Sequence, residues 1–282
     1  MTGKKAGGFL KKKFKKIFYA ALFSLFASFC SSCGGGPDSR IIVAGSTSVQ
    51  PYAEILAEEF AHLYPEYEID VQGGGSSAGI AAVVSGTADV GMSSRDLTDS
   101  EAGLWTAMIA KDGLAVIVHP DNPVAGLTLG EIRGIYDATV TNWNEVGGHN
   151  AKIHVITREE GSGTRSAFES LVMGDRMITP KAIVQDSNGA VRQLVLSDKN
   201  SIGFISLGLV DGAVKALSLD GVTPTAENVE NGSYSLYRPF LFVLAAEPEG
   251  MARLYVEFCF SDEAQALIAD EGLIPYSFFM EE

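Results

Sequence analysis

The sequence has 282 residues, of which 46% are hydrophobic and 20% are charged, and its formal net charge at pH 7 is −14. A chain of this length and hydrophobic content can bury a large core in one or two domains, which excludes an intrinsically disordered protein. The acidic balance argues against nucleic acid as a partner, because binding to a phosphate backbone requires basic surface.

The N-terminal residues carry the pattern of an export signal. Seven lysines lie within residues 1–16, and residues 17–29 then form an uncharged and mostly apolar run. A positive leader followed by about a dozen apolar residues is typical of a secretory signal peptide and is too short to span a bilayer comfortably. An uncleaved membrane anchor is the alternative interpretation. We therefore expect the protein to be exported and to face the periplasm or the cell exterior.

Two cysteines, Cys30 and Cys33, follow the apolar run and are followed in turn by three glycines and a proline. This pattern resembles a lipoprotein cleavage site with a flexible tether. The small Ser32 suits cleavage before Cys33, which makes Cys33 the predicted lipidation site, with Cys30 as the alternative. Several acyl chains would hold the protein stably at a membrane. We predict a lipoprotein signal peptide over residues 1–32 and a tether over residues 33–39.

The remaining cysteine, Cys259, lies in an apolar segment. We expect it to be a small buried side chain rather than a reactive thiol. If Cys33 starts the mature protein, no internal disulfide is expected. Histidine, cysteine and aspartate show no metal-ligand spacing, so we expect no metal and no cofactor.

The first part of the folded chain alternates short apolar runs with helical patterns, separated by small polar turns. This alternation is typical of an α/β domain. The expected strands are residues 40–44, 68–72, 88–92 and 114–119, and the expected helices are residues 52–64 and 78–85.

The later part of the chain indicates a second α/β lobe. A chain that leaves the first lobe near His119 and returns near Pro239 would join its lobes by two crossing strands, and such a hinge permits closure over a ligand. The expected elements are helices over 127–136 and 166–172, one helix or a pair of helices over 250–272, and strands over 152–157, 201–206 and 238–244. The predicted division is lobe 1 over residues 40–119 and 239–282, and lobe 2 over residues 120–238.

Four turns rich in glycine and serine lie at the ends of these strands: Gly45–Ser48, Gly74–Ser77, Ser93–Arg95 and Gly161–Thr164. Glycine lets the backbone approach a bound group, hydroxyls donate hydrogen bonds, and free N–H groups at a helix start favour anions. One such turn is usually structural. Four turns converging beyond the carboxyl ends of strands predict an anion site between the lobes.

Arg158 precedes the fourth of these turns by three residues. Its guanidinium could lie beside the same anion, at the mouth of a cleft where it makes few core contacts. The alternative is a surface ion pair with Glu159 or Glu160. The same two interpretations apply to Arg95, which lies within the third turn.

The motifs Gly-Ser-Thr-Ser-Val, Gly-Gly-Gly-Ser-Ser-Ala-Gly, Gly-Met-Ser-Ser-Arg and Arg-x-x-Gly-Ser-Gly-Thr-Arg occur in this order. Together they resemble the phosphate-binding subunit (PstS-type) of bacterial ABC phosphate importers, over nearly everything after Ser39. The resemblance implies a two-lobed, type II periplasmic-binding-protein-like fold that holds dehydrated phosphate in the inter-lobe cleft by backbone N–H groups, hydroxyls and one arginine. It also implies delivery of phosphate to the membrane permease subunits of an importer.

The resemblance also implies which residues bind phosphate. Ser94 stands where the best-known members carry an aspartate that accepts the proton of phosphate, so that Ser94, Arg95 or Asp96 must fill this place. Another tetrahedral oxyanion, such as sulfate or molybdate, therefore stays open as the ligand. Ser77 is included because it is adjacent to Ser76. The implied ligand residues are Thr47, Ser48, Ser76, Ser77, Ser94, Arg95, Arg158, Ser162, Gly163 and Thr164.

An enzyme is the rival interpretation, because residues 75–79 fit the G-x-S-x-G pattern of a hydrolase nucleophile elbow with Ser77 as nucleophile. His119, His149 and His154 lie downstream. A hydrolase would leave the other serine turns and Arg158 unexplained. We therefore predict a binding protein that catalyses nothing, and whose partners are inorganic phosphate, the importer and, through its lipid anchor, the membrane.

Overall fold

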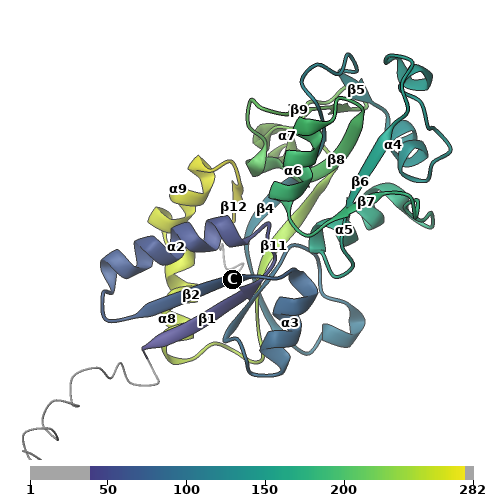
Figure 1. Ribbon diagram of the computed structural model, residues 1–282. Helices are drawn as coiled ribbons and strands as arrows, with labels where there is room; N and C mark the ends of the chain where they lie inside the picture. The colour runs from purple at the N-terminus through teal and green to yellow at the C-terminus, as the bar shows by residue number, and fades with distance from the viewer. Residues whose placement is uncertain (1–38, 277–282) are drawn as a thin grey trace, which may run out of the picture. The chain divides into compact units, whose positions relative to one another are not determined.

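The computed structural model describes residues 39–276, and the described residues from Arg40 onward fall in one compact unit. Figure 1 shows its helices and strands. The predicted signal peptide and the lipidation site at Cys33 lie outside the described residues, as does the tether up to residue 38. Within residues 39–276, no helix is long and apolar enough to cross a membrane.

One mixed sheet runs through the described chain in the order β2-β1-β3-β11-β4-β8-β6-β7, with β9 and β12 also paired to β4. Parallel pairs join β1 to β2 and β3, and β6 to β7 and β8, whereas β11 is antiparallel to β3 and β4. The predicted α/β class is confirmed. The strands are β1 (Arg40–Gly45), β2 (Glu68–Gly73), β3 (Val90–Ser93), β4 (Trp105–Val118), β6 (His154–Arg158), β7 (Ile183–Gln185), β8 (Ser201–Ser206), β9 (Lys215–Ala216), β11 (Tyr237–Leu244) and β12 (Ile274–Pro275). A small separate sheet pairs β5 (Gly126–Leu127) with β10 (Ser218–Leu219).

Helices cover both faces of the first half of the sheet. Alternate residues of β11 point to opposite faces, because side chains alternate along a strand. Phe240 and Phe242 pack in a core with α2 (Gln50–Leu63), α8 (Gly250–Cys259) and α9 (Asp262–Asp270). Leu241 and Val243 pack instead in a smaller cluster with Ile80 of α3 (Ser76–Val84).

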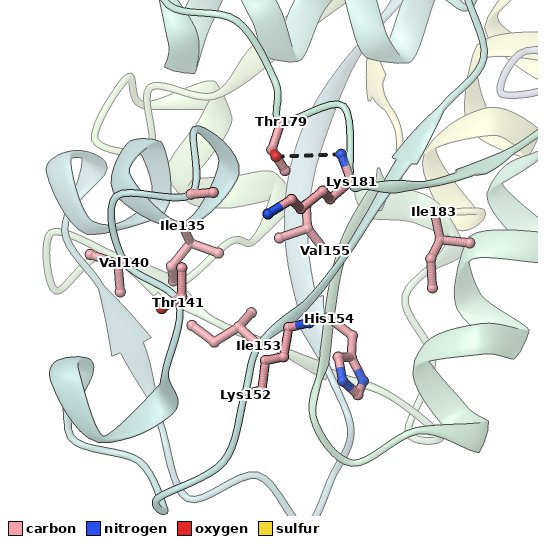
Figure 2. Close-up of a pocket in the computed structure, with 11 residues that line it drawn as sticks. Ile135, Val140, Thr141, Lys152, Ile153, His154, Val155, Thr179, Lys181 and Ile183 are labelled. Carbon is pink, nitrogen blue, oxygen red and sulfur yellow. Dashed lines mark hydrogen bonds between the residues drawn. The ribbon is translucent and has the colours of Figure 1, made fainter.

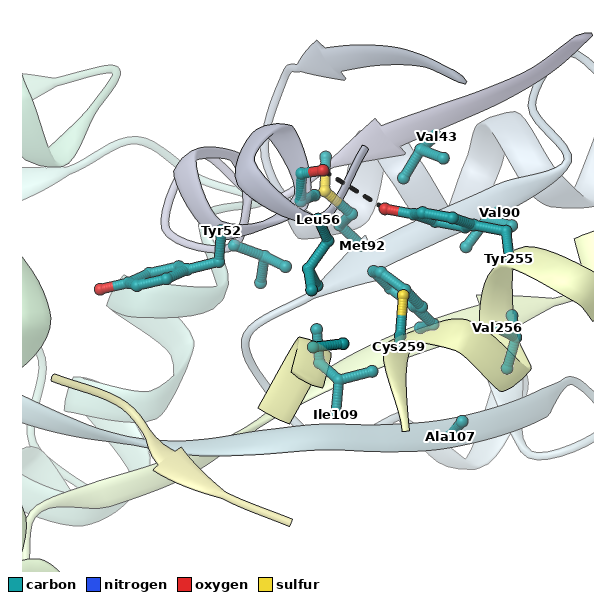
Figure 3. Close-up of a cluster of buried hydrophobic side chains, with 14 of the residues drawn as sticks. Val43, Tyr52, Leu56, Val90, Met92, Ala107, Ile109, Tyr255, Val256 and Cys259 are labelled. Carbon is teal, nitrogen blue, oxygen red and sulfur yellow. Dashed lines mark hydrogen bonds between the residues drawn. The ribbon is translucent and has the colours of Figure 1, made fainter. Parts of the chain in front are cut away.

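Cys259 lies within the larger of these two cores (Figure 3). Its side chain is fully buried, as the sequence predicted, and burial raises the pKa of its thiol far above the ordinary value. Tyr255, one turn earlier on α8, donates a hydrogen bond from its hydroxyl to the Ala53 carbonyl. Within the described residues, Cys259 is therefore a packing residue.

The second half of the sheet has its own cores. Leu114 and Val116 of β4 pack with α4 (Leu129–Tyr136), α5 (Gly163–Phe168) and the following π-helical turn, Glu169–Met173. The intervening Ala115 and Ile117 pack on the opposite face, against α6 (Asn188–Ser197). Two short helices complete this half, the 3-10 turn Trp143–Val146 and α7 (Ala226–Glu230). Two 3-10 turns, Asp99–Glu101 and Leu207–Leu209, follow β3 and β8.

Strand β4 joins the two sets of cores. Its first part pairs with β11 and its last part, from Leu114, pairs with β8. The sequence indicated only the last part, because Lys111, Asp112 and Gly113 interrupt the apolar pattern. Asp112 is nevertheless fully buried, since it forms an ion pair with Arg238, its neighbour on β11. The predicted lobe boundaries at residues 119 and 239 stay a prediction.

Candidate oxyanion-binding site

The first and fourth turns, which are 116 residues apart in sequence, meet directly. Ser48 Oγ and Thr164 Oγ1 share a hydrogen bond of 2.8 Å, and both side chains are about 1% exposed. Arg158 donates from Nη2 to Thr47 Oγ1 at 3.1 Å and from Nη1 to Thr164 Oγ1 at 3.5 Å. Hydroxyls and a guanidinium from distant segments therefore face one another in a buried cluster.

The second and third turns add the hydroxyls of Ser76 and Ser94 to this cluster, and the first turn adds that of Ser46. Ser46 Oγ donates to Ser94 Oγ at 2.8 Å, and Ser76 Oγ accepts from the Ser94 backbone N–H at 3.1 Å. A Cβ at Gly163 would lie 2.2 Å from Ser76 Oγ and 2.5 Å from Ser94 Oγ. Glycine at position 163 is therefore required for the fourth turn to approach the other two.

Helix starts supply backbone N–H groups to the same region. The sequence predicted helices from residues 78 and 166, but α3 begins at Ser76 and α5 at Gly163. Both begin earlier because the serine turns form the first helical turn, in which N–H groups have no intrahelical acceptor. Ser162 is the N-cap of α5, and its Oγ accepts from the Arg165 N–H at 3.3 Å.

Arg158 is buried, with 1% of its surface exposed, so the expectation of a residue at a cleft mouth with few core contacts is wrong. Its guanidinium donates to both carboxylate oxygens of Glu159, at 2.9 and 3.0 Å, and to the carbonyls of Gln185 and Asp186. The ion pair with Glu159 exists, but its arginine is not on the surface. This pairing leaves the cluster with little net charge.

Ser77 and Arg95 lie beside this cluster. The Arg95 guanidinium donates to both carboxylate oxygens of Glu101, at 2.8 and 2.9 Å, and to Ser77 Oγ at 3.3 Å. The hydrogen bonds from Arg95 to Glu101 lower the pKa of the Glu101 carboxyl to about 2. Both Ser77 and Arg95 line a cavity of about 470 Å³ that Arg238 also borders. Arg95 is thus engaged as an ion-pair partner, and its role as a ligand residue stays a prediction.

Asn188 is the residue of this region that the sequence did not reveal. It is 2% exposed, and its Nδ2 donates to Ser48 Oγ at 2.8 Å. The preceding Ser187 is a recognisable helix N-cap, whose side chain accepts from the Ala190 N–H. That signal marks the start of α6 but not a contact with a residue 140 positions earlier.

A second cavity, of about 220 Å³, lies away from the serine turns (Figure 2). Its lining is largely apolar, with Lys181 in the upper part of the view and Lys152 and His154 in the lower part. His154 pairs with Asp198 at 2.6 Å. None of the predicted ligand residues lines this cavity, so it does not belong to the serine cluster.

Comparisons with known proteins identify the family of this chain. A model described as "PBP superfamily domain" matches residues 33–263. The chain belongs to the PBP superfamily. Within it, the relatives identify a PstS-type protein: the phosphate-binding protein PstS of Bacillus subtilis is 29% identical over 94% of both chains.

Two solved structures of this family are similar to the chain. One is described as a phosphate ABC transporter substrate-binding protein with bound phosphate, from Clostridium perfringens. It is 42% identical with a TM-score of 0.82, over 84% of this chain and 99% of that one. The other is an ABC-type phosphate transport receptor from Vibrio cholerae, which is 41% identical with a TM-score of 0.72, over 84% and 100% of the two chains. The predicted periplasmic-binding-protein-like fold is therefore confirmed.

Proposed function

We propose that this PstS-type protein binds inorganic phosphate outside the cytoplasm and delivers it to an ABC importer. One observation carries the proposal: four hydroxyl-bearing turns and the buried Arg158 converge on a single cluster. The relatives support it, because they are named as phosphate-binding proteins and as components of phosphate ABC transporters.

The residues proposed to bind phosphate are hydrogen-bond donors that already face one another. Hydroxyls of Thr47, Ser48 and Thr164 would turn from their present partners to the oxyanion, and the Arg158 guanidinium would donate beside them. Micromolar affinity requires about 8 kcal/mol. Hydrogen bonds to charged groups contribute roughly 1.5–3 kcal/mol each, so that several such donors suffice.

Ser94 occupies the place of the family's aspartate and is hydrogen-bonded to Ser46. A hydroxyl can accept a hydrogen bond from a protonated phosphate oxygen, but it can also rotate to donate to an unprotonated one. A carboxylate at this place would reject sulfate more strongly than the Ser94 hydroxyl does. Sulfate carries no proton, so a carboxylate oxygen would face a sulfate oxygen without a hydrogen bond between them. We propose phosphate as the ligand and retain sulfate and molybdate as competitors that the titration must exclude.

A serine hydrolase is not favoured by the contacts of Ser77. Its Oγ accepts from the Arg95 guanidinium, whose N–H groups can only donate, so that Arg95 does not serve as a general base. Of the possible bases, His119 Nδ1 accepts from the Asp121 N–H, and His154 lines a different cavity from the one that Ser77 borders. We propose that the protein binds its ligand without catalysis, in agreement with its substrate-binding relatives.

The proposal is tested by calorimetric titration of the purified full chain, freed of bound anion, with phosphate, arsenate, sulfate and molybdate. We expect one phosphate per chain with a dissociation constant in the micromolar range or below, and weaker binding of sulfate and molybdate. Tighter binding of sulfate than of phosphate would refute the proposed ligand. Turnover of an ester substrate that disappears in Ser77→Ala would restore the hydrolase interpretation.

We further propose that Cys33 is acylated and anchors the protein to the membrane. The support is the sequence pattern: a basic leader, an apolar run and the small Ser32 before Cys33. Cys33→Ala should prevent incorporation of radiolabelled fatty acid and release the protein from the membrane fraction, because the thiol is the acylation point. Cys30→Ala is the matched control and should remain anchored. If Cys30→Ala loses the label and Cys33→Ala keeps it, the assignment of the two cysteines is reversed.

A further inference from the structure

Asn188 makes two hydrogen bonds that define the direction of its amide. Its Oδ1 accepts from the Ser206 backbone N–H at 3.3 Å, and its Nδ2 donates to Ser48 Oγ at 2.8 Å. A backbone N–H can only donate, so the amide oxygen must face Ser206 and the amide nitrogen must face Ser48. Asn188 therefore cannot accept the hydrogen of Ser48.

Ser206 is itself held in place, which fixes the amide further. Its Oγ donates to Asp112 Oδ1 at 2.7 Å, and Asp112 in turn pairs with Arg238 on the neighbouring strand. All four residues are buried, with at most 2% of the surface of each exposed. Rotation of the Asn188 amide would leave the Ser206 N–H without a partner in a buried environment, which is costly.

The direction of this amide determines what Ser48 can do. A serine hydroxyl has one hydrogen and two lone pairs, and one lone pair is occupied by the Asn188 N–H. The hydroxyl hydrogen is then free for Thr164 Oγ1 or for a ligand. Thr164 Oγ1 is constrained in the same way, because it lies 3.5 Å from Nη1 of Arg158, which can only donate. One shared hydrogen bond joins the two hydroxyls, so at least one hydroxyl hydrogen remains for an anion.

We propose that Asn188 is a positioning residue for the oxyanion site, which acts by orienting the Ser48 hydroxyl as a donor to phosphate. The inference rests on the proposed phosphate-binding function and deepens it. The Asn188 amide need not touch the anion: it holds a lone pair of Ser48, so that Ser48 meets a fully ionised oxygen with its hydrogen. The sequence indicated Ser48 as a ligand residue, but it did not indicate Asn188, which determines whether the Ser48 hydroxyl donates or accepts.

A double-mutant cycle tests this role. Phosphate dissociation constants are measured by calorimetry for the parent chain, Asn188→Ala, Ser48→Ala and the double variant. We expect each single variant to bind roughly tenfold more weakly, because one hydrogen bond to a charged ligand is lost or misdirected. The double variant should bind about as weakly as Ser48→Ala alone, since Asn188 acts through Ser48.

Two further variants separate this role from a structural one. Ser187→Ala removes the N-cap of α6 without touching Ser48, so it should lower the melting temperature while phosphate affinity stays within about twofold of the parent. Asn188→Asp has nearly the same shape and still accepts from the Ser206 N–H, so it is expected to fold even if Asn188→Ala does not. Its carboxylate would take the Ser48 hydrogen, and phosphate binding should fall at least tenfold.

These measurements tell apart a failure of the proposed phosphate-binding function and a failure of the positioning role of Asn188. If the parent chain binds no phosphate, the proposed function fails and the role of Asn188 with it. If the parent binds phosphate but the losses in Asn188→Ala and Ser48→Ala multiply in the double variant, only the role of Asn188 is refuted. Parent-like affinity of Asn188→Asp would refute that role equally.

Discussion

Arg158 illustrates how a single residue combines binding and stability. An unpaired arginine on the surface would contribute little to the stability of the fold. The guanidinium of Arg158 is instead buried, and it donates hydrogen bonds to the Glu159 carboxylate and to two backbone carbonyls. Lysine would keep the charge while losing the planar fork that donates several hydrogen bonds at fixed angles. The same substitution should therefore affect both ligand affinity and the stability of the ligand-free protein.

Arg158→Lys is expected to weaken phosphate binding at least tenfold, and Arg158→Ala by more. Without ligand, either change should lower the free energy of unfolding by about 1–3 kcal/mol, because buried acceptors lose their donors. Phosphate titrations and melting curves provide the measurements. Arg192→Lys is the control, because Arg192 of α6 pairs with Asp211 and with none of the hydroxyls of the serine cluster. Parent-like phosphate affinity in Arg158→Lys would exclude Arg158 from the site.

At the scale of elements, the pairing of β4 with β11 contains a buried ion pair. Arg238 donates from Nε and Nη2 to Asp112 Oδ2 at 3.0 and 2.9 Å, and both residues are at most 2% exposed. Burial raises the pKa of the Asp112 carboxyl, whereas the Arg238 guanidinium and the Ser206 hydroxyl oppose that shift. The pair lies where β4 passes from one set of cores to the other.

Arg238→Met is expected to lower the free energy of unfolding by about 3–5 kcal/mol, because it leaves a buried carboxylate without its cation. Asp112→Asn combined with Arg238→Met should recover a large part of that loss, since no buried charge remains. Urea denaturation measures both. Arg253→Met, in an exposed pair with Glu257, should leave the urea midpoint nearly unchanged. Equal effects of Arg238→Met and Arg253→Met would show that burial of the pair is unimportant.

At the scale of the whole molecule, the charge opposes the proposed ligand. The formal net charge is −14, and the guanidinium of Arg158 is paired with Glu159. Neither the overall field nor the site itself attracts an anion over a long distance. Selective binding must therefore come from short-range hydrogen bonds inside the closed cluster.

We therefore expect that the rate constant for phosphate association does not decrease as potassium chloride is raised from about 0.05 to about 0.3 M. The negative protein repels the phosphate anion, and added salt weakens this repulsion. Stopped-flow fluorescence at constant pH provides the measurement, and sucrose at matched viscosity is the control for slower diffusion. A severalfold decrease with salt, not reproduced by sucrose, would demonstrate attractive steering by a positive surface.

The sequence by itself determined the α/β class, most helices and strands, and the turns that gather in the site. These features are local: apolar periodicity selects helix or strand, and glycine with serine between them marks the turns. The resemblance of the four motifs also named Ser48, Thr164 and Arg158 as members of one site. The structure joins these three residues by hydrogen bonds.

Only the tertiary structure decided which partners the polar side chains have. Ser48 meets Asn188 across 140 positions, Asp112 meets Arg238 across 126, and Arg158 meets Thr47 across 111. No local pattern encodes such contacts, because they depend on how distant strands and helices pack together. Burial of a polar group is decided at the same level, since Asp112 and Arg158 lose water only when the complete fold supplies their hydrogen bonds.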